Sequence, residues 1–191
     1  IRDRAGVATV HVVDELETHR PTACRIVEMS SDAAKDGTDT PGLAGYMHGA
    51  YWVIPLMPAD VVGACQLPIN VLELAALVIS IATFAPRLVL DSELRVHVMS
   101  DSLASVDVIT DATAHAELMQ AAHSWLLARP EFGAFANLAL IGHGYGESNV
   151  MSDAASRGYA DKLRTLSVAL NVRLQRIEAA PGAAELLADL R

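Results

Sequence analysis

The chain has 191 residues, of which 52% are apolar and 19% are charged, and its formal net charge is −9. This length is enough for one substantial hydrophobic core, and the apolar content excludes a disordered chain. The negative charge is unusual for a protein that binds nucleic acid by itself, because phosphate contacts favour a basic surface.

The N-terminal part, residues 1–23, gives an ambiguous pattern. VATVHVVDELE is compatible with a strand or a helix, and the proline that follows predicts a linker or connection segment. No secretory signal is visible, and the start at Ile1 instead of methionine indicates a piece of a longer chain. Cys24 and Cys65 have no metal-type spacing, which favours buried thiols in a reducing, intracellular compartment, cytoplasmic or nuclear.

Strand patterns come next. CRIVEMSSD, residues 24–32, alternates as a strand does, and DGTDTPG predicts a turn. LAGYMHGAYWVIPLM predicts two strands that are hinged near His48 and Gly49.

INVLELAALVISIATFA has the length and apolar density of a helix that ends before Pro86. The longest uncharged apolar run, Leu74–Pro86, has thirteen residues and is too short to span a bilayer. We therefore expect a core helix and no membrane partner.

The second half predicts a strand at 95–101, helical structure from 102 to 128 and a short strand at FANLALIG. A final long helix carries an apolar stripe at Tyr159, Leu163, Leu166 and Leu170, as a helix packed on a sheet does. Residues 171–191 are expected to form an extension with a short helix. The order of elements predicts an α/β fold.

Acidic residues stand at the ends of these elements. Asp32 and Asp101 end two strands, Glu73 lies in the first turn of the first long helix, and Asp153 opens the last helix. Four acids brought together would repel one another unless a cation neutralises them. Oxygen ligands alone favour Mg²⁺ or Mn²⁺, and two such ions would stabilise the attacking and leaving oxygens of a phosphodiester.

Each acid also has a structural alternative. Asp36 or Asp39 could be the functional acid in place of Asp32, and Glu73 could cap its helix together with Asn70. Asp101 could be an N-cap, and Asp153 could interact with the helix dipole. His143 could be a solvated side chain, and the glycines around it are a poor match to a phosphate-binding loop.

Several motifs, in this order, resemble the ribonuclease H superfamily. SSDAAKDGTDTPGLAGY is similar to the opening strand of that family, NVLELAAL to its glutamate-bearing helix and VHVMSDSLASVDVI to its strand that ends in Asp-Ser. In GHGYGESNVMSD, an asparagine follows the histidine by six positions and an aspartate follows it by ten. NVMSDAASRG resembles the ribonuclease H domains of retroelement reverse transcriptases, with Ser152 in place of an alanine.

The resemblance covers residues 24–170 and implies a catalytic domain with a ribonuclease H-like fold, a mixed five-stranded sheet flanked by helices. It implies that the four acids, Asp32, Glu73, Asp101 and Asp153, are catalytic and bind two Mg²⁺ ions, for which Mn²⁺ can substitute. His143, in a loop made mobile by its glycines, would help to activate water or to release the product.

The activity that the resemblance implies is hydrolysis of the RNA strand of an RNA–DNA hybrid. The partner would be a fused or adjacent polymerase domain of a reverse transcriptase polyprotein. Candidate substrate contacts are Asn149, which also could fix the loop, and three cations: Lys35, Arg157 and Lys162. Because the chain has few cations, we expect the isolated domain to bind hybrid weakly. The alternatives are a silent scaffold of the same fold and a DNA-cutting transposase or resolvase relative.

Overall fold

The computed structural model describes residues 25–36, 38, 40–57, 67–91, 93–111, 116–144 and 149–191. The predictions for residues 1–23, for both cysteines and for Asp39 therefore lie outside the described residues.

The described residues form the following strands and helices in chain order: β1 Arg25–Ala34, β2 Gly42–Met47, β3 Ala50–Pro55, α2 Ile69–Phe84, the 3₁₀ helix η2 Ala85–Arg87, β4 Leu94–Ser100, α3 Leu103–Asp111, α4 Glu117–Leu127, α5 Phe132–Ala136, β5 Ala139–His143, α6 Val150–Ser156, α7 Ala160–Ala169, β6 Gln175–Arg176 and α8 Ala183–Asp189.

The strands form one mixed sheet in the order β5-β4-β1-β2-β3-β6. β1, β2 and β3 are antiparallel neighbours, whereas β4 and β5 run parallel to β1 on its other side. The sheet has six strands instead of the predicted five, because Gln175 and Arg176 pair with the edge of β3. The α/β class is confirmed.

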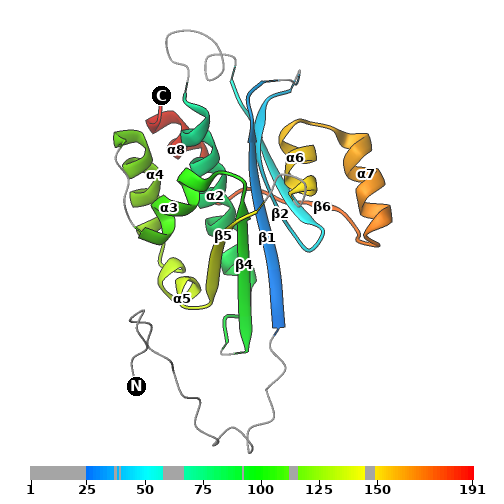
Figure 1. Cartoon of the computed structure of the whole chain (residues 1–191), viewed down its shortest axis with the longest axis horizontal. Helices are drawn as coiled ribbons and strands as arrows, with labels where there is room; N and C mark the ends of the chain where they lie inside the picture. The colour runs from blue at the N-terminus through cyan, green and yellow to red at the C-terminus, as the bar shows by residue number, and fades with distance from the viewer. Residues whose placement is uncertain are drawn as a thin grey trace, which may run out of the picture.

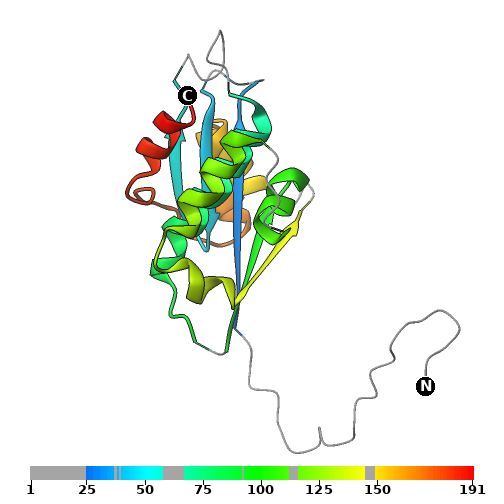
Figure 2. The same ribbon diagram turned by 90° about the vertical axis from the view of Figure 1, so that its left-hand side faces the viewer.

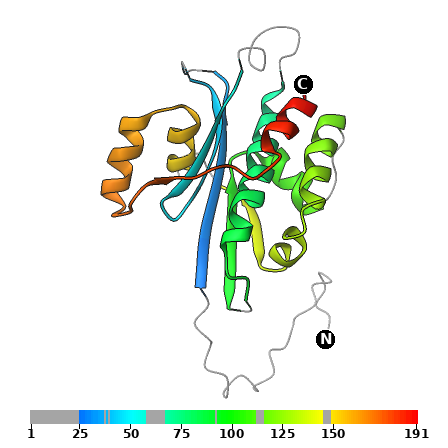
Figure 3. The ribbon, with the colours of Figure 1, turned by 180° about the vertical axis from the view of Figure 1, so that it is seen from behind.

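Helices cover both faces of this sheet. α2, α3, α4 and α8 lie on one side, and α6 and α7 lie on the other (Figure 1). The view in Figure 2 places the first group in front of the sheet, and the reverse view in Figure 3 shows α7 outside α6. The carboxyl ends of the parallel strands β1 and β4 lie at the same end of the sheet, between the two helical layers.

Helix α2 forms the centre of the hydrophobic core. Every residue from Val71 to Phe84 is buried except Ala82, so the helix is apolar all round, as expected of a helix with packing partners on all sides. By length and composition alone, Ile69–Arg87 could cross a membrane, but 78% of its most apolar window is buried inside the protein. Its composition is therefore that of a core helix, and a charged residue within it, Glu73, needs a specific explanation.

The hairpin of β2 and β3 follows the sequence prediction. His48 and Gly49 both have positive φ, 46° and 85°, which is the backbone of a two-residue hairpin turn. A Cβ at Gly45 of β2 would lie 2.0 Å from Ser80 Oγ and 2.4 Å from Trp52 Nε1. The glycine therefore lets the sheet and α2 approach closely.

The last part of the chain differs from the prediction in two places. The predicted strand at FANLALIG begins later, at Ala139, because Phe135 is part of α5 and is fully buried in the core. The predicted last long helix is two helices, α6 and α7, since Gly158 takes a left-handed backbone with a φ of 69° between them. Of the predicted apolar stripe, Leu163 is buried, whereas Tyr159 and Leu170 are exposed.

The segment after residue 170 contributes β6 and α8. Leu186, Leu187 and Leu190 belong to the same buried cluster as α2, and the backbone N–H of Ala180 donates to Thr83 Oγ1 of α2 at 2.8 Å. The predicted extension therefore packs on the same core as the rest of the fold.

Candidate metal centre

Two neighbouring parallel strands bring the first two acids together. β1 and β4 pair so that Ser30 lies opposite Met99, and Asp32 and Asp101 follow these residues by two positions in each chain segment. Side chains two apart on a strand share a face, so both carboxylates come to the same end of the sheet. Asp32 does not end its strand as predicted, because β1 continues to Ala34 by pairing with β2.

Helix α2 supplies the third acid from the opposite layer. The helix begins at Ile69 after Pro68, so Glu73 lies beyond the first turn where it was predicted. Its carboxylate accepts a hydrogen bond from the backbone N–H of Ala33 on β1. Asn70 lies inside the helix, where its Oδ1 accepts from the backbone N–H of Val71 at 3.1 Å, so it is not the N-cap that a capping box with Glu73 requires.

The three acids form a compact set of oxygen atoms. Asp32, Glu73 and Asp101 each offer one carboxylate oxygen, and these oxygens all lie within 4.8 Å of one another. Glu73 Oε2 and Asp101 Oδ1 are buried and have no hydrogen-bond partner among the described residues. Such unpartnered oxygens are costly in a folded protein, and they fit the oxygen-only coordination that Mg²⁺ prefers.

The three acids and Asp153 line one pocket of about 270 Å³, together with the remaining residues Ala33, Lys35, Asp36, Ile69 and Arg157. We call this the acidic pocket. Its electrostatics are unfavourable for charged carboxylates without a cation. Burial raises the pKa of Asp32 to about 6, and it raises the pKa of Glu73 to about 9 with a further contribution from the charges of Asp32 and Asp101. Burial also raises the pKa of Asp101.

Asp101 is not the cap of the helix that follows it. The backbone N–H of Ser105 donates to Ser102 Oγ at 3.3 Å, so Ser102 performs the capping role at the start of α3. Asp101 is thereby left free of the structural role that the sequence alone allowed it.

The fourth acid is positioned by the docking of α6 on β1. Asn149, only 3% exposed, donates from Nδ2 to the backbone oxygen of Ser31 at 2.7 Å and accepts from Ser152 Oγ. Ser152 Oγ also lies 2.8 Å from Ser30 Oγ. These buried bonds hold the start of α6 on the sheet, so the Asn149 side chain fixes this segment and is not exposed as a candidate substrate contact would be.

Asp153 lies in the first turn of α6 and faces the acidic pocket, but its carboxylate is already paired with two cationic side chains. Its Oδ1 accepts from Arg157 Nε at 2.6 Å, and its Oδ2 accepts from Lys162 Nζ at 2.9 Å. Burial alone would raise its pKa, yet the hydrogen bonds from Lys162 and Arg157 hold the pKa of Asp153 below its usual value. Asp153 is therefore charge-compensated in a way that the other three acids are not.

His143 is the last residue of β5 and pairs with Ser100 of β4, so it does not lie in the loop where it was predicted. Its Nε2 is 3.1 Å from the backbone oxygen of Asp101, and its side chain is exposed. The strand thus holds the imidazole against the backbone of Asp101, beside the acidic pocket.

The candidate substrate cations are tied to the protein in this structure. Lys35 Nζ donates to the backbone oxygen of Leu67 at 2.9 Å, and Arg157 Nη1 donates to that of Asp36 at 3.2 Å. Lys162 is bound to Asp153.

One residue of the site, Ser156, had been given no role from the sequence. Its Oγ donates to Asp32 Oδ2 from the last residue of α6. The signal was present in the sequence, because Ser156 is the serine of the Asp-x-x-Ser-Arg pattern that begins at Asp153.

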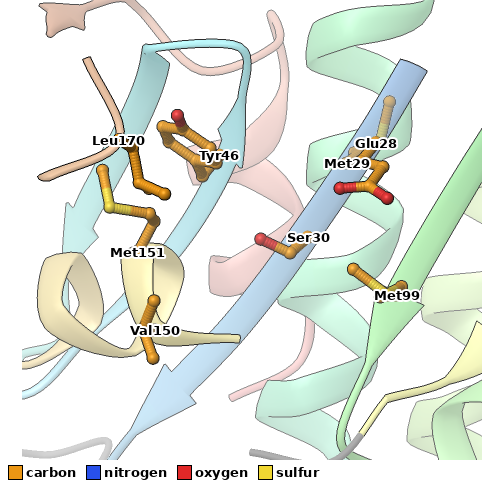
Figure 4. Close-up of a pocket in the computed structure, with 8 residues that line it drawn as sticks. All are labelled: Glu28, Met29, Ser30, Tyr46, Met99, Val150, Met151 and Leu170. Carbon is orange, nitrogen blue, oxygen red and sulfur yellow. The ribbon is translucent and has the colours of Figure 1, made fainter. Parts of the chain in front are cut away.

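A second pocket of about 220 Å³ lies between α6 and the sheet (Figure 4). It contains Ser30, two residues before Asp32 on β1, and a single carboxylate, Glu28; its other lining residues are Met29, Tyr46, Met99, Val150, Met151 and Leu170. One carboxylate among mostly apolar side chains cannot supply the several oxygen ligands of a magnesium ion. The candidate metal centre is therefore the acidic pocket.

Comparisons of this chain with protein-family models and with curated proteins give no match.

Proposed function

We propose that the chain is a divalent-cation-dependent endonuclease with a ribonuclease H-like fold, which hydrolyses the RNA strand of RNA–DNA hybrids. The observation that carries this proposal is the set of three carboxylate oxygens within 4.8 Å, drawn from β1, α2 and the end of β4. The spacing of the four acids in the sequence and their resemblance to the ribonuclease H superfamily support it.

A binding or scaffold domain has no physical need for this set. Glu73 is 9% exposed inside an otherwise apolar helix, and Asp32 is 4% exposed. Burying acids beside one another lowers stability unless the site gains a cation in return. Their placement therefore supports a metal-binding role over a purely structural one.

The residues have separate roles in the proposed reaction. Asp32, Glu73 and Asp101 would hold Mg²⁺ through carboxylate oxygens, and Asp153 would face a second ion across the acidic pocket. A bound divalent ion would supply a more acidic water and would stabilise the leaving oxygen. His143 would accept or return a proton at its imidazole, since it is exposed and lies next to Asp101.

The choice of RNA within a hybrid rests on the sequence resemblance. Contacts to 2′-hydroxyl groups are the means by which a protein distinguishes RNA from DNA. The pattern from Asn149 to Arg157 further supports an origin in a retroelement reverse transcriptase, with a polymerase domain as the partner that provides most of the substrate affinity.

A cleavage assay on three labelled substrates tests the proposed function. RNA–DNA hybrid, duplex RNA and duplex DNA of the same sequence are incubated with the protein in Mg²⁺ or in EDTA. We expect cleavage of the RNA strand of the hybrid in Mg²⁺ alone. Cleavage of duplex DNA would instead support a transposase or resolvase type of activity, and no cleavage of any substrate would support a scaffold.

A further inference from the structure

Asp153 is paired with two cations, Arg157 and Lys162, and the role inferred for them rests on the proposed function. Arg157, the C-cap of α6, lies four residues after Asp153, and Lys162 reaches Asp153 from α7. Together they take both oxygens of the carboxylate, at 2.6 Å and 2.9 Å. The side chains of Arg157 and Lys162 are 32% and 46% exposed, so both can also reach solvent.

This arrangement disfavours a metal ion on the same carboxylate. A divalent ion bound to Asp153 would stand next to a guanidinium and an ammonium group, and like charges at this separation repel strongly. Each oxygen already accepts from one cation, so an incoming ion binds Asp153 less strongly while both cations remain beside it. Metal binding and the ion pairs of Asp153 therefore compete.

Once displaced, the cationic side chains can bind phosphate beside the acidic pocket. Arg157 lines this pocket and also contacts the backbone of Asp36 at its rim. The whole chain has only 14 lysines and arginines against 23 acids, so few cations are available to bind phosphate. A guanidinium released at this position can bind phosphate oxygens with two hydrogen bonds.

We propose that Arg157 and Lys162 are an exchangeable counter-charge: they neutralise Asp153 in the metal-free protein and move to the phosphates of the substrate when a divalent ion takes Asp153. Metal and substrate then favour each other's binding, because each is linked to the same release. The metal-free protein is held in a state that binds nucleic acid poorly.

The affinity for hybrid in EDTA tests, without any metal, whether cations released from Asp153 bind nucleic acid. In Asp153→Asn the amide cannot hold both cations, so they are free in the absence of an ion. We expect this variant to bind hybrid roughly two- to fivefold more tightly than the wild type, the range of a partly exposed ion pair. Its salt dependence should also be steeper by up to about two phosphate contacts.

Asp36→Asn is the matched control, because it removes the same charge from the same pocket and leaves Asp153 with its partners. It should bind hybrid more weakly than Asp153→Asn. The tighter binding of Asp153→Asn should disappear when Arg157→Gln and Lys162→Gln are added to it. Equal binding by Asp36→Asn and Asp153→Asn would overturn the proposal, since the effect would then be one of net charge alone.

Calorimetric titration with Mn²⁺, without nucleic acid, tests the competition. Lys162→Gln should bind Mn²⁺ roughly two- to fivefold more tightly than the wild type. Arg164→Gln, which loses an equal charge on α7 where Arg164 pairs with the exposed Asp161 at 3.1 Å, should leave the affinity unchanged. Identical Mn²⁺ affinities for these two variants would contradict the exchange.

The same measurements distinguish a failure of the counter-charge proposal from a failure of the proposed function. If the wild type binds Mn²⁺ and cuts hybrid but the variants show no exchange, only the counter-charge proposal is overturned. If the wild type neither binds Mn²⁺ nor cuts hybrid, the proposed function is overturned together with it.

Discussion

Glu73 and Asp153 are both acids of the acidic pocket, yet the protein compensates their charges in opposite ways. Glu73 has a raised pKa of about 9 because it is buried, so in the metal-free protein it carries a proton at neutral pH. Asp153 has a lowered pKa because Lys162 and Arg157 bind it. In the metal-free protein a proton thus neutralises Glu73 and two cationic side chains neutralise Asp153. In the metal-bound protein the ions would neutralise both acids instead.

His143→Ala should slow cleavage of hybrid by roughly 10²-fold, the low end for a general acid–base group. The imidazole lies beside Asp101 and is not among the three acids whose oxygens meet, so Mn²⁺ affinity measured by calorimetry should stay the same. A loss of metal binding in this variant would show that His143 is part of the metal site itself.

At the level of single residues, three of the four acids that the sequence singles out bring their oxygens together, whereas Asp153 lines the same pocket but is paired with two cations. Asp32 and Asp101 end up together because adjacent parallel strands align them, which follows from the order of elements. The ion pair of Lys162 with Asp153 depends on the angle between α6 and α7, and no sequence spacing specifies that angle. The contact of Ser156 with Asp32 crosses 124 residues and was likewise not assigned.

At the level of elements, the joint between α6 and α7 positions the cations of the site. Thr38 Oγ1 and Thr40 Oγ1 donate to the backbone oxygen of Arg157 at 2.8 Å and 2.9 Å, which ties the joint to the loop after β1. Gly158 follows with a positive φ, and its position lets α7 turn so that Lys162 faces Asp153.

Gly158→Ala should therefore lower the free energy of unfolding by about 1–3 kcal/mol, because a left-handed backbone is strained for alanine. The added Cβ would also lie 2.1 Å from Thr40 Oγ1. Chemical denaturation of the variant measures this change. Gly133→Ala in α5 is the control: its Cβ would meet nothing within 4 Å, and alanine favours a helix, so stability should be unchanged or higher. If Gly158→Ala and Gly133→Ala were equally stable, a side chain at position 158 would not strain the joint between α6 and α7.

The first four strands and α2 were predictable at this scale because their patterns are strong and local. The hairpin at His48 and Gly49 follows from turn chemistry, and α2 from a long apolar run. The division of the last helix was not predicted, because a single glycine such as Gly158 is compatible with a continuous helical pattern. The last two residues of α5, Phe135 and Ala136, belong to the run for which the sequence predicts a strand, since a short apolar run fits either structure.

At the scale of the whole molecule, the metal-free protein should lose stability as pH rises. The folded-state pKa values of Asp32 and Glu73, about 6 and about 9, are above their ordinary values of 3.8 and 4.5. The folded state therefore binds more protons than the unfolded state between about pH 4 and pH 9, and stability falls across this window. Thermal unfolding in EDTA at a series of pH values measures the fall, and Mg²⁺ should reduce it.

Glu73→Gln isolates the contribution of the helix α2 acid. The amide has the shape of the protonated carboxyl group but does not titrate, so the part of the fall above about pH 6 should disappear. An unchanged pH dependence in this variant would mean that Glu73 is not the buried acid that loses its proton there.

The central claim is that the acidic pocket is the metal centre of a nuclease, and Asp101→Asn tests it most directly. The measurement is the rate of RNA-strand cleavage in a hybrid at saturating Mg²⁺, for the wild type and the variant side by side. We predict that the variant loses most of the activity while it remains folded, with an equal or higher unfolding temperature in EDTA because a buried repulsion is relieved. Undiminished cleavage by Asp101→Asn would contradict the assignment of the site.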